Sequence, residues 1–255
     1  MILIQGIFDA LAQIIQAIPL TVQIIIFGAL IVIFMVSIIV GFIKNRRLKK
    51  KYTKKIEEVV PKYVKGKAEY EDAGGSGFRI NAVPKKYMSD ITVALVLLNR
   101  ENLLHPIINH FQKDQDKLAF MGTLRKTATI TIEVIPKEEH LIKDLFKEIV
   151  DLETVKIDKK FDAAFLVKSS EVYSARSLFL AKEGQQLRAI LLKYRDHIKR
   201  FAIHHEEAQS SLNAIFFISK DIEVAKFFPI FFKMAEVYDS VDFEKYRRSY
   251  KKKRT

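Results

Sequence analysis

The first 43 residues differ sharply from the rest of the chain in their pattern of apolar and polar positions. Residues 20–43 contain no ionisable side chain, whereas residues 44–51 contain six Lys or Arg. A helix over 20–43 would reach ~36 Å at ~1.5 Å per residue, enough to cross a hydrocarbon core of ~30 Å. A buried core helix is the alternative, but such helices are not normally apolar for so long. The pattern therefore predicts one transmembrane helix at 20–43.

The charges beside the apolar segment predict its orientation. Residues 1–43 contain no Lys or Arg, whereas a secretory signal peptide has a basic start. Short positively charged flanks stay on the cytoplasmic side of a membrane. We therefore expect a single-pass protein with a cytosolic carboxyl-terminal domain. The cations expected to set topology and contact lipid are Lys44, Arg46, Arg47, Lys49, Lys50 and Lys51.

Residues 1–19 have an amphipathic pattern. Gln5, Asp9, Gln13 and Gln16 lie near one helical stripe, and apolar residues surround it up to Pro19. Such a segment is typical of a short helix in the membrane interface. A second membrane crossing is the alternative, although the segment is short and polar for one.

The pattern after residue 43 alternates between strand and helix periods. We expect a basic juxtamembrane helix and a Gly-rich linker within 44–77, a folded domain at 78–240 and a basic tail at 241–255. The fold class predicted is α+β, with helices packed on an antiparallel or mixed sheet. The expected strands are 90–99, 116–124, 127–136, 161–169, 198–207 and 211–219, and the expected helices are 100–111, 136–152, 171–181, 183–194 and 221–241.

Two of these segments allow finer predictions. In 127–136, Ile130, Ile132 and Val134 alternate with Thr129, Thr131 and Glu133, which predicts a strand with one face in water. A short Arg-Lys turn joins it to the preceding strand, so we expect a hairpin there. The segment 221–241 carries aromatic residues at helical spacing, which could belong to the core or could form a face that meets a partner.

Composition limits the function classes. The chain has 43 Lys and Arg, 30 Asp and Glu and a net charge of +13. Asp9 is the single charged side chain before residue 44, so the part beyond it carries +14. A basic surface can bind anionic lipid headgroups or the phosphates of RNA. The absence of cysteine excludes disulfides and thiol nucleophiles, and it argues against cysteine-ligated zinc.

A search for catalytic motifs gives little. His105 and His110 are five residues apart, a poor fit for one helix face, and His204 and His205 are neighbours that point oppositely on a strand. We therefore expect surface histidines in loops and no metal site. The Gly-rich segment 74–77 lacks the Lys and Ser or Thr of a phosphate-binding loop. We expect a protein without enzymatic activity or cofactor.

The basic tail is the strongest chemical signal. Tyr246 and Tyr250 interleave with its cations at helical spacing, a pattern that suits RNA or an anionic surface through phosphate contacts and stacking. A solubilising or membrane-attracted tail is the alternative. The candidate phosphate-binding residues are Lys245, Arg247, Arg248, Lys251, Lys252, Lys253 and Arg254.

The order of these parts resembles the calumin family, coiled-coil-domain-containing membrane proteins associated with the Sec translocon. The resemblance covers about residue 20 to the end and rests on element order and apolar pattern, without a catalytic signature. It is carried by the apolar span, the basic juxtamembrane segment, ITVALVLLNRENLLHPIINHF, KLAFMGTL, TITIEVIPKEEHLIKDLFKEIVDL, FLVKSSEVYSARSLFL, LRAILLKYRDHIKRFAIHH, NAIFFISKDIEVAKFFPIFFKMAEVYDSV and the basic end.

The resemblance implies a non-enzymatic factor that assists insertion of multispanning membrane proteins. Its implied partners are the Sec translocon, rRNA of the large ribosomal subunit and other membrane-protein insertion factors, with anionic lipids as a further partner. The alternative, from another class, is a membrane-anchored cytosolic domain that binds anionic lipid or a protein and never contacts the ribosome.

The chain also departs from the family pattern. The family's long acidic lumenal segment is absent before Leu20, and its long coiled coil is reduced to the short tail after Asp239. Calcium binding is therefore not carried over. Together with the Lys and Ile richness and the missing Cys, these departures indicate a minimal prokaryotic-type relative, archaeal in character. The expected membrane is the plasma membrane for a prokaryote and the endoplasmic reticulum for a eukaryote.

Overall fold

The computed structural model describes residues 18–102, 115–138, 149–205, 209–219 and 223–242, and the chain divides into two compact units. The first unit is Met1–Asn45 with Asn99–Phe111, and the second is Arg46–Leu98 with Gln112–Thr255. Helix α2 (Leu20–Glu57) starts in the first and ends in the second. The expected segment 1–19, apart from its last two residues, and most of the expected helix 100–111 lie outside the described residues.

The first unit contains a close contact between α2 and a loop. A Cβ atom on Gly41 would lie 2.1 Å from the carbonyl oxygen of Arg100, so only glycine fits this approach. The Arg100 guanidinium donates a 3.0 Å hydrogen bond to the Oδ1 atom of Asn45, which is 1% exposed. A buried polar side chain is thereby satisfied.

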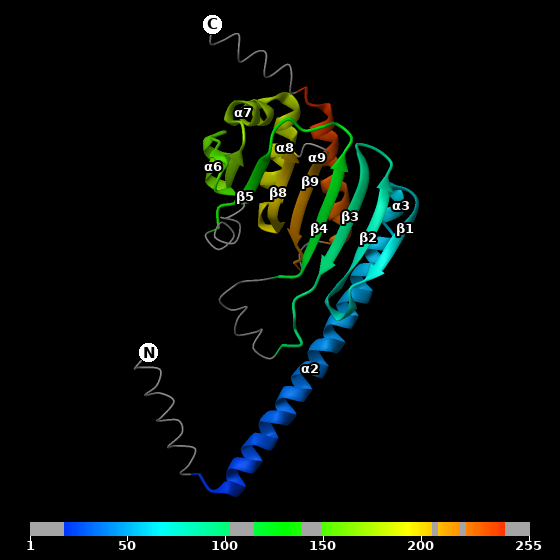
Figure 1. Cartoon of the computed structure of the whole chain (residues 1–255), viewed down its shortest axis with the longest axis vertical. Helices are drawn as coiled ribbons and strands as arrows, with labels where there is room; N and C mark the ends of the chain where they lie inside the picture. The colour runs from blue at the N-terminus through cyan, green and yellow to red at the C-terminus, as the bar shows by residue number, and fades with distance from the viewer. Residues whose placement is uncertain (1–17, 103–114, 139–148, 206–208, 220–222, 243–255) are drawn as a thin grey trace. The chain divides into compact units, whose positions relative to one another are not determined.

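The second unit is built on a nine-stranded antiparallel sheet with the order β1-β2-β3-β4-β9-β8-β5-β7-β6 (Figure 1). The α+β class is confirmed. The strands are β1 (Val64–Asp72), β2 (Gly77–Pro84), β3 (Met88–Val96), β4 (Lys117–Leu124), β5 (Ile132–Pro136), β6 (Glu153–Thr154), β7 (Phe165–Ser169), β8 (Ile198–His205) and β9 (Ser210–Phe217).

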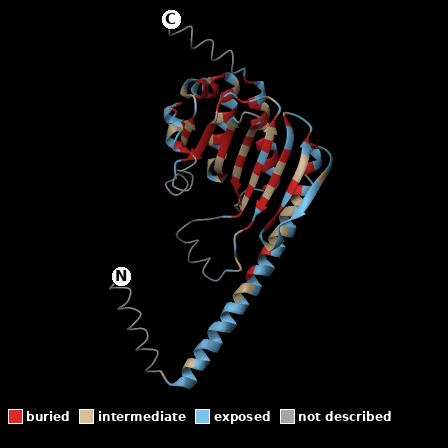
Figure 2. Cartoon of the chain, in the orientation of Figure 1, coloured by how far each residue is buried: buried red, intermediate tan, exposed pale blue. Residues whose placement is uncertain are grey.

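Helices and short turns complete the second unit. Helix α9 packs on the sheet, because Phe120 of β4 contacts the rings of Phe228 and Phe231 at 5.0 and 4.8 Å between centroids. Burial alternates along strands such as β4, as Figure 2 shows. The helical elements are α3 (Val60–Tyr63), η1 (Gly74–Ser76), α6 (Lys159–Ala164), α7 (Val172–Leu180), α8 (Lys182–Lys193), η2 (Arg195–His197), η3 (Val224–Lys226) and α9 (Phe227–Ser240).

Several predictions of elements are confirmed. Strands lie at the expected places as β3, β4, β8 and β9, and β8 pairs with β9. The expected strand 127–136 is confirmed in its second half, as β5. Helices α7 and α8 match their expected segments. The aromatic residues of α9 belong to the core, since Phe227, Phe228 and Phe231 are at most 1% exposed. The expected strand 161–169 is in part helix, with α6 preceding β7. Residues 139–148, in the expected helix 136–152, lie outside the described residues.

The linker expected before residue 78 is wrong. Residues 64–72 form β1, which pairs with β2, and the domain already includes the buried Ile56, Val60 and Val64. Gly74, one of the glycines that suggested a linker, begins the one-turn η1 helix instead. Gly66 has a φ of +67° where the β1 register shifts. The juxtamembrane helix is interrupted before Pro61, where α2 ends at Glu57 and α3 begins at Val60.

The hairpin expected between β4 and β5 is also wrong. Strand β4 pairs with β3 and β9, whereas β5 pairs with β7 and β8. Residues 125–131 cross one end of the sheet instead of turning back. Hydrogen bonds hold this crossing, with the Arg125 Nε donating to the Met88 carbonyl at 3.0 Å, Lys126 donating to the Val241 carbonyl, and the Ala128 amide donating to the Ser210 hydroxyl at 2.7 Å.

Gly184 allows a stability test of the α7–α8 junction. A Cβ atom there would lie 1.7 Å from the Leu178 carbonyl oxygen. This oxygen belongs to the backbone, so relieving the clash requires a backbone shift. We expect Gly184→Ala to lower the free energy of unfolding by roughly 1–3 kcal/mol, as overpacking of a core does. The measurement is thermal unfolding of the detergent-solubilised full chain. Gly28→Ala is the control, because nothing lies within 4 Å of its Cβ position; equal midpoints for the two variants would contradict the prediction.

Candidate membrane anchor and polar sites

The described part of the chain contains one helix that is long and apolar enough to cross a membrane, by length and composition. This is α2, and only 6% of its apolar window is buried. Bulky side chains such as Ile25, Phe27 and Ile31 are 58–69% exposed. A continuous apolar surface of this kind marks a site of contact with lipid or another apolar partner.

The six juxtamembrane cations lie on α2 directly after this apolar segment. Exposed side chains are found at Lys44, Arg46, Arg47, Lys50 and Lys51. Their contact with headgroups or phosphates stays a prediction. Lys49 differs from the other five. Its Nζ atom forms an ion pair with Asp72 and donates a 2.7 Å hydrogen bond to the Gly74 carbonyl oxygen.

Lys49 therefore has a structural role in the hairpin of β1 and β2. The hydrogen bond from Lys49, followed by that from the Gly74 amide, lowers the pKa of the Asp72 carboxyl. One turn and a half further along α2, Lys55 pairs with Glu223 at 2.9 Å and lowers the pKa of that carboxyl in the same way. Sequence spacing could not distinguish these two lysines from their solvated neighbours, since their partners are 23 and 168 residues away.

The cations of the basic tail, from Lys245 to Arg254, lie outside the described residues. Their role in binding phosphate stays a prediction. His105, His110 and His140 also lie outside the described residues.

A buried ion pair lies on the sheet face opposite α9, and sequence analysis missed it. Glu133 of β5 is 2% exposed and accepts hydrogen bonds from Arg200 of β8, at 3.0 Å from Nε and 2.6 Å from Nη2. The Nε2 atom of His204 lies 2.6 Å from the same carboxylate, and the Nδ1 atom lies 3.4 Å from the Asn213 amide nitrogen. The water-facing role expected of Glu133 is therefore wrong.

The same contacts correct the expectation for one histidine. His204 lies within β8 with 28% of its side chain exposed and bonds to Glu133, so it is not a surface histidine in a loop. His205 is exposed at the end of that strand. The signal in the sequence was the spacing of Arg200 and His204, because residues four apart in a strand share one face.

Burial and charge act in opposite directions on Glu133. Desolvation would raise the pKa of its carboxyl, but hydrogen bonds from His204 and Arg200, with the attraction of the Arg200 charge, hold the pKa below its ordinary value. The carboxylate is thus ionised, with Arg200 on both of its oxygens and His204 on one of them. This arrangement joins β5 to β8.

Metal ligands do not gather in the part of the chain that the structure describes. Within those residues no group of three His, Cys, Asp or Glu side chains is placed to hold a metal ion. No family model matches the sequence, and no curated protein is significantly similar to it.

Proposed function

We propose that the chain is a single-span membrane protein whose second unit lies in the cytosol, where it associates with the ribosome and the Sec translocon and assists insertion of multispanning proteins. The observation that carries the proposal is the row of exposed cations on α2 immediately after an exposed apolar segment. Such a row favours retention of the following domain on the cytoplasmic side. The translocon, the ribosomal large subunit and other insertion factors enter the proposal through the resemblance to the calumin family.

The charge distribution supports a polyanionic partner. The chain carries +13 overall, and its ionisable residues lie almost entirely after residue 43. A positive domain beside a membrane will attract rRNA phosphates and anionic headgroups over a Debye length of ~8–10 Å. The domain is then concentrated at the place where a nascent chain enters the bilayer.

Neutralising the basic tail is the direct test of ribosome association. We expect replacement of Lys245, Arg247, Arg248 and Lys251 to Arg254 by Gln to weaken co-sedimentation with ribosomes at least tenfold and to flatten its salt dependence, since each phosphate contact adds ~0.7–0.9 to the slope of log affinity against log salt. The measurement is co-sedimentation of the detergent-solubilised full chain at several salt concentrations.

A matched control is needed because any loss of charge reduces nonspecific attraction. The control variant changes to Gln seven exposed cations elsewhere in the second unit: Lys67, Arg79, Lys137, Lys156, Lys159, Arg176 and Lys182. Unchanged co-sedimentation of the tail variant at every salt concentration, or an equal loss in the control, would remove the tail from the proposal.

The second candidate is a membrane-anchored domain that binds anionic lipid without contacting the ribosome. The exposed Arg46, Arg47, Lys50 and Lys51 favour it, because cations beside a span contribute ~1 kcal/mol each near an anionic surface. Flotation of residues 44–255 with vesicles separates the two. Binding to phosphatidylserine vesicles together with failure to co-sediment with ribosomes would favour the lipid function.

A further inference from the structure

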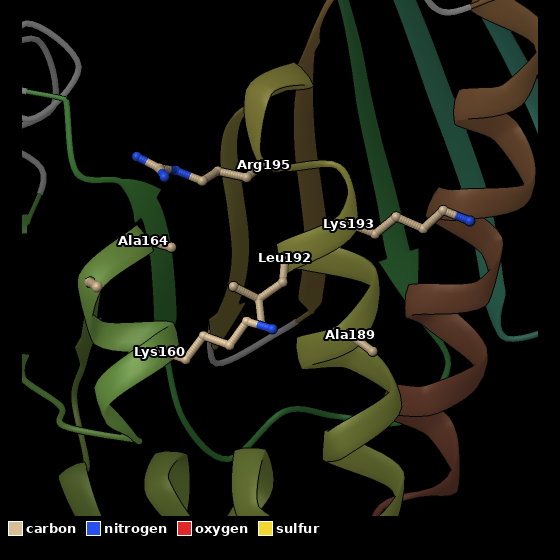
Figure 3. A pocket seen from close by; sticks show the side chains of 7 residues that line it. Lys160, Ala164, Ala189, Leu192, Lys193 and Arg195 are labelled. Atoms are coloured by element: carbon tan, nitrogen blue, oxygen red, sulfur yellow. The ribbon is translucent and has the colours of Figure 1, made fainter.

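Three hollows lie in series along the outer side of α8 and α9, and all three are cationic. The first, about 600 Å³, lies between α6 and α8 and is lined by Lys160, Lys193 and Arg195 over a floor of alanine and leucine. Figure 3 shows Lys160 reaching toward Leu192 of α8, while Lys193 extends toward α9. No acidic residue lines this hollow.

Neighbouring hollows share lining residues. Lys193 also borders the second hollow, of about 300 Å³, which Lys226 and Lys233 complete. Lys233 in turn borders the third, of about 340 Å³, which lies beside Lys62 and Lys86. We call this series the α8–α9 track; it is defined by the residues lining the three hollows.

The cations of the track are mostly available to a ligand. Glu236 is the single acid among the lining residues, and it is paired with Lys233 at 3.0 Å. Lys85 is also engaged, because its ammonium donates to the carbonyl oxygens of Pro61 and Lys62 at 2.9 and 3.1 Å. Lys62, Lys86 and Lys160 are exposed and pair with no acid in the described structure. Cations therefore outnumber acids among the residues that line the track.

Aromatic rings interleave with these charges. Tyr194 lines the second hollow, with the Lys193 ammonium 5.4 Å from its ring centre. Tyr63 and Tyr87 line the third, and the Tyr63 ring stacks on Phe232 at 4.6 Å. Tyr87 has a φ of +67°, a left-handed conformation that is strained for a residue other than glycine. Strain of this kind concentrates at ligand sites, where the fold holds a side chain in a required place.

We infer that the α8–α9 track binds single-stranded RNA, with its lysines along the phosphates and its tyrosines against unpaired bases. Proteins that hold single strands combine a positive groove with rings on which bases stack. Duplex RNA offers phosphates but keeps its bases stacked inside the helix, so the tyrosines would have no role there. The inference rests on the proposed ribosome association and adds to it a site outside the tail and an RNA class.

The test uses the full chain in detergent, with the seven tail cations already changed to Gln so that the tail does not contribute. The probe is fluorescent oligouridine of about 12 nucleotides, within the usual site size for single strands. Changing Lys160, Lys193 and Arg195 to Gln is expected to weaken binding at least tenfold at low salt. The slope of log affinity against log salt should fall by about 2, at ~0.7 per phosphate contact on a single strand.

Two comparisons make the result specific. Changing Lys67, Lys137 and Arg79 to Gln removes the same charges away from the track and is expected to leave the slope unchanged. Tyr194→Ala is expected to weaken oligouridine binding, whereas Tyr194→Phe, which keeps the ring, should retain it. A thermal midpoint equal to that of the parent chain confirms that each variant is folded.

Three results would overturn the inference. The first is unchanged oligouridine binding by the variant of Lys160, Lys193 and Arg195. The second is duplex RNA that binds as tightly as oligouridine. The third is polyglutamate that competes as well as RNA, which would indicate an acidic protein partner. Ribosome co-sedimentation is measured in a separate experiment. Oligouridine binding without ribosome binding would refute the proposed function but support RNA binding by the track. Ribosome binding without oligouridine binding would refute RNA binding by the track and leave the proposed function in place.

Discussion

Glu133→Gln is expected to lower the free energy of unfolding by about 3 kcal/mol. The carboxylate is 2% exposed and has two hydrogen bonds from Arg200 and a close contact to His204. Removing one partner of a buried ion pair typically costs ~3–5 kcal/mol, because the other charge stays in a poorly solvated place. Gln keeps the shape of Glu, so the loss reports the charge and not a cavity.

Chemical unfolding of the detergent-solubilised chain measures this effect. Glu153→Gln is the matched control, since Glu153 is exposed on β6 and its replacement should change stability by less than ~0.5 kcal/mol. Combining Glu133→Gln with Arg200→Met removes both charges and should recover part of the loss. A Glu133→Gln variant as stable as the parent would show that the pair contributes nothing.

The same pair gives the protein an acid-sensitive stability. The pKa of Glu133 is lower in the folded state than in the unfolded chain, so its contribution is complete above the unfolded pKa of ~4.3. The contribution is lost as the pH falls through the lower folded pKa. Thermal midpoints of the parent should therefore fall more steeply below about pH 4 than those of Glu133→Gln. Parallel curves would contradict this assignment.

Phe231→Ala is expected to lower the free energy of unfolding by about 3–5 kcal/mol, because it removes a large buried side chain. The side chain is fully buried in α9, stacks on Phe120 at 4.8 Å and meets Phe232 edge to face at 6.0 Å. Alanine would leave a cavity between the helix and the sheet, lined by groups too rigid to fill it. The loss should appear as a lower midpoint in chemical unfolding without a change in secondary structure at low denaturant.

Phe231→Leu separates the cavity from the aromatic contact. Leucine fills most of the volume, so a loss of about 1–2 kcal/mol is expected from it. A Phe231→Ala variant that loses no more than Phe231→Leu would show that the space collapses around the missing ring.

The sequence predicted the fold where one strand face or helix face is buried. Strands β3, β4, β8 and β9 carry alternating or continuous apolar runs, and α7 and α8 carry a helical stripe. The prediction failed at β1, because eight of its nine residues are exposed or half-buried and no apolar pattern marks it. It failed at the junction of β4 and β5 because the bonds that hold residues 125–131 reach Met88, Ser210 and Val241, far along the chain.

The candidate sites were predictable to different degrees. The candidate membrane anchor and its flanking cations could be predicted from the composition of one contiguous segment, because no long-range contact is needed to recognise it. The Glu133 pair needed the register of β5 and β8, in which Glu133 faces Ala202 between Arg200 and His204. The α8–α9 track needed three separate segments, 62–87, 160–195 and 226–236, brought together by packing. Isolated lysines along a sequence give no sign of such convergence.

Strand β1 has a consequence for how partners can bind. It ends the strand order, and a bare outer strand can recruit an extended peptide or a second copy of the chain through its unpaired backbone groups. Here that edge is interrupted by the irregular register between Lys65 and Glu69 and by the left-handed Gly66, and its Lys and Glu side chains are exposed. These features oppose strand addition and edge-to-edge aggregation. Under the proposed function, the same features would keep extended nascent chains from pairing with this sheet.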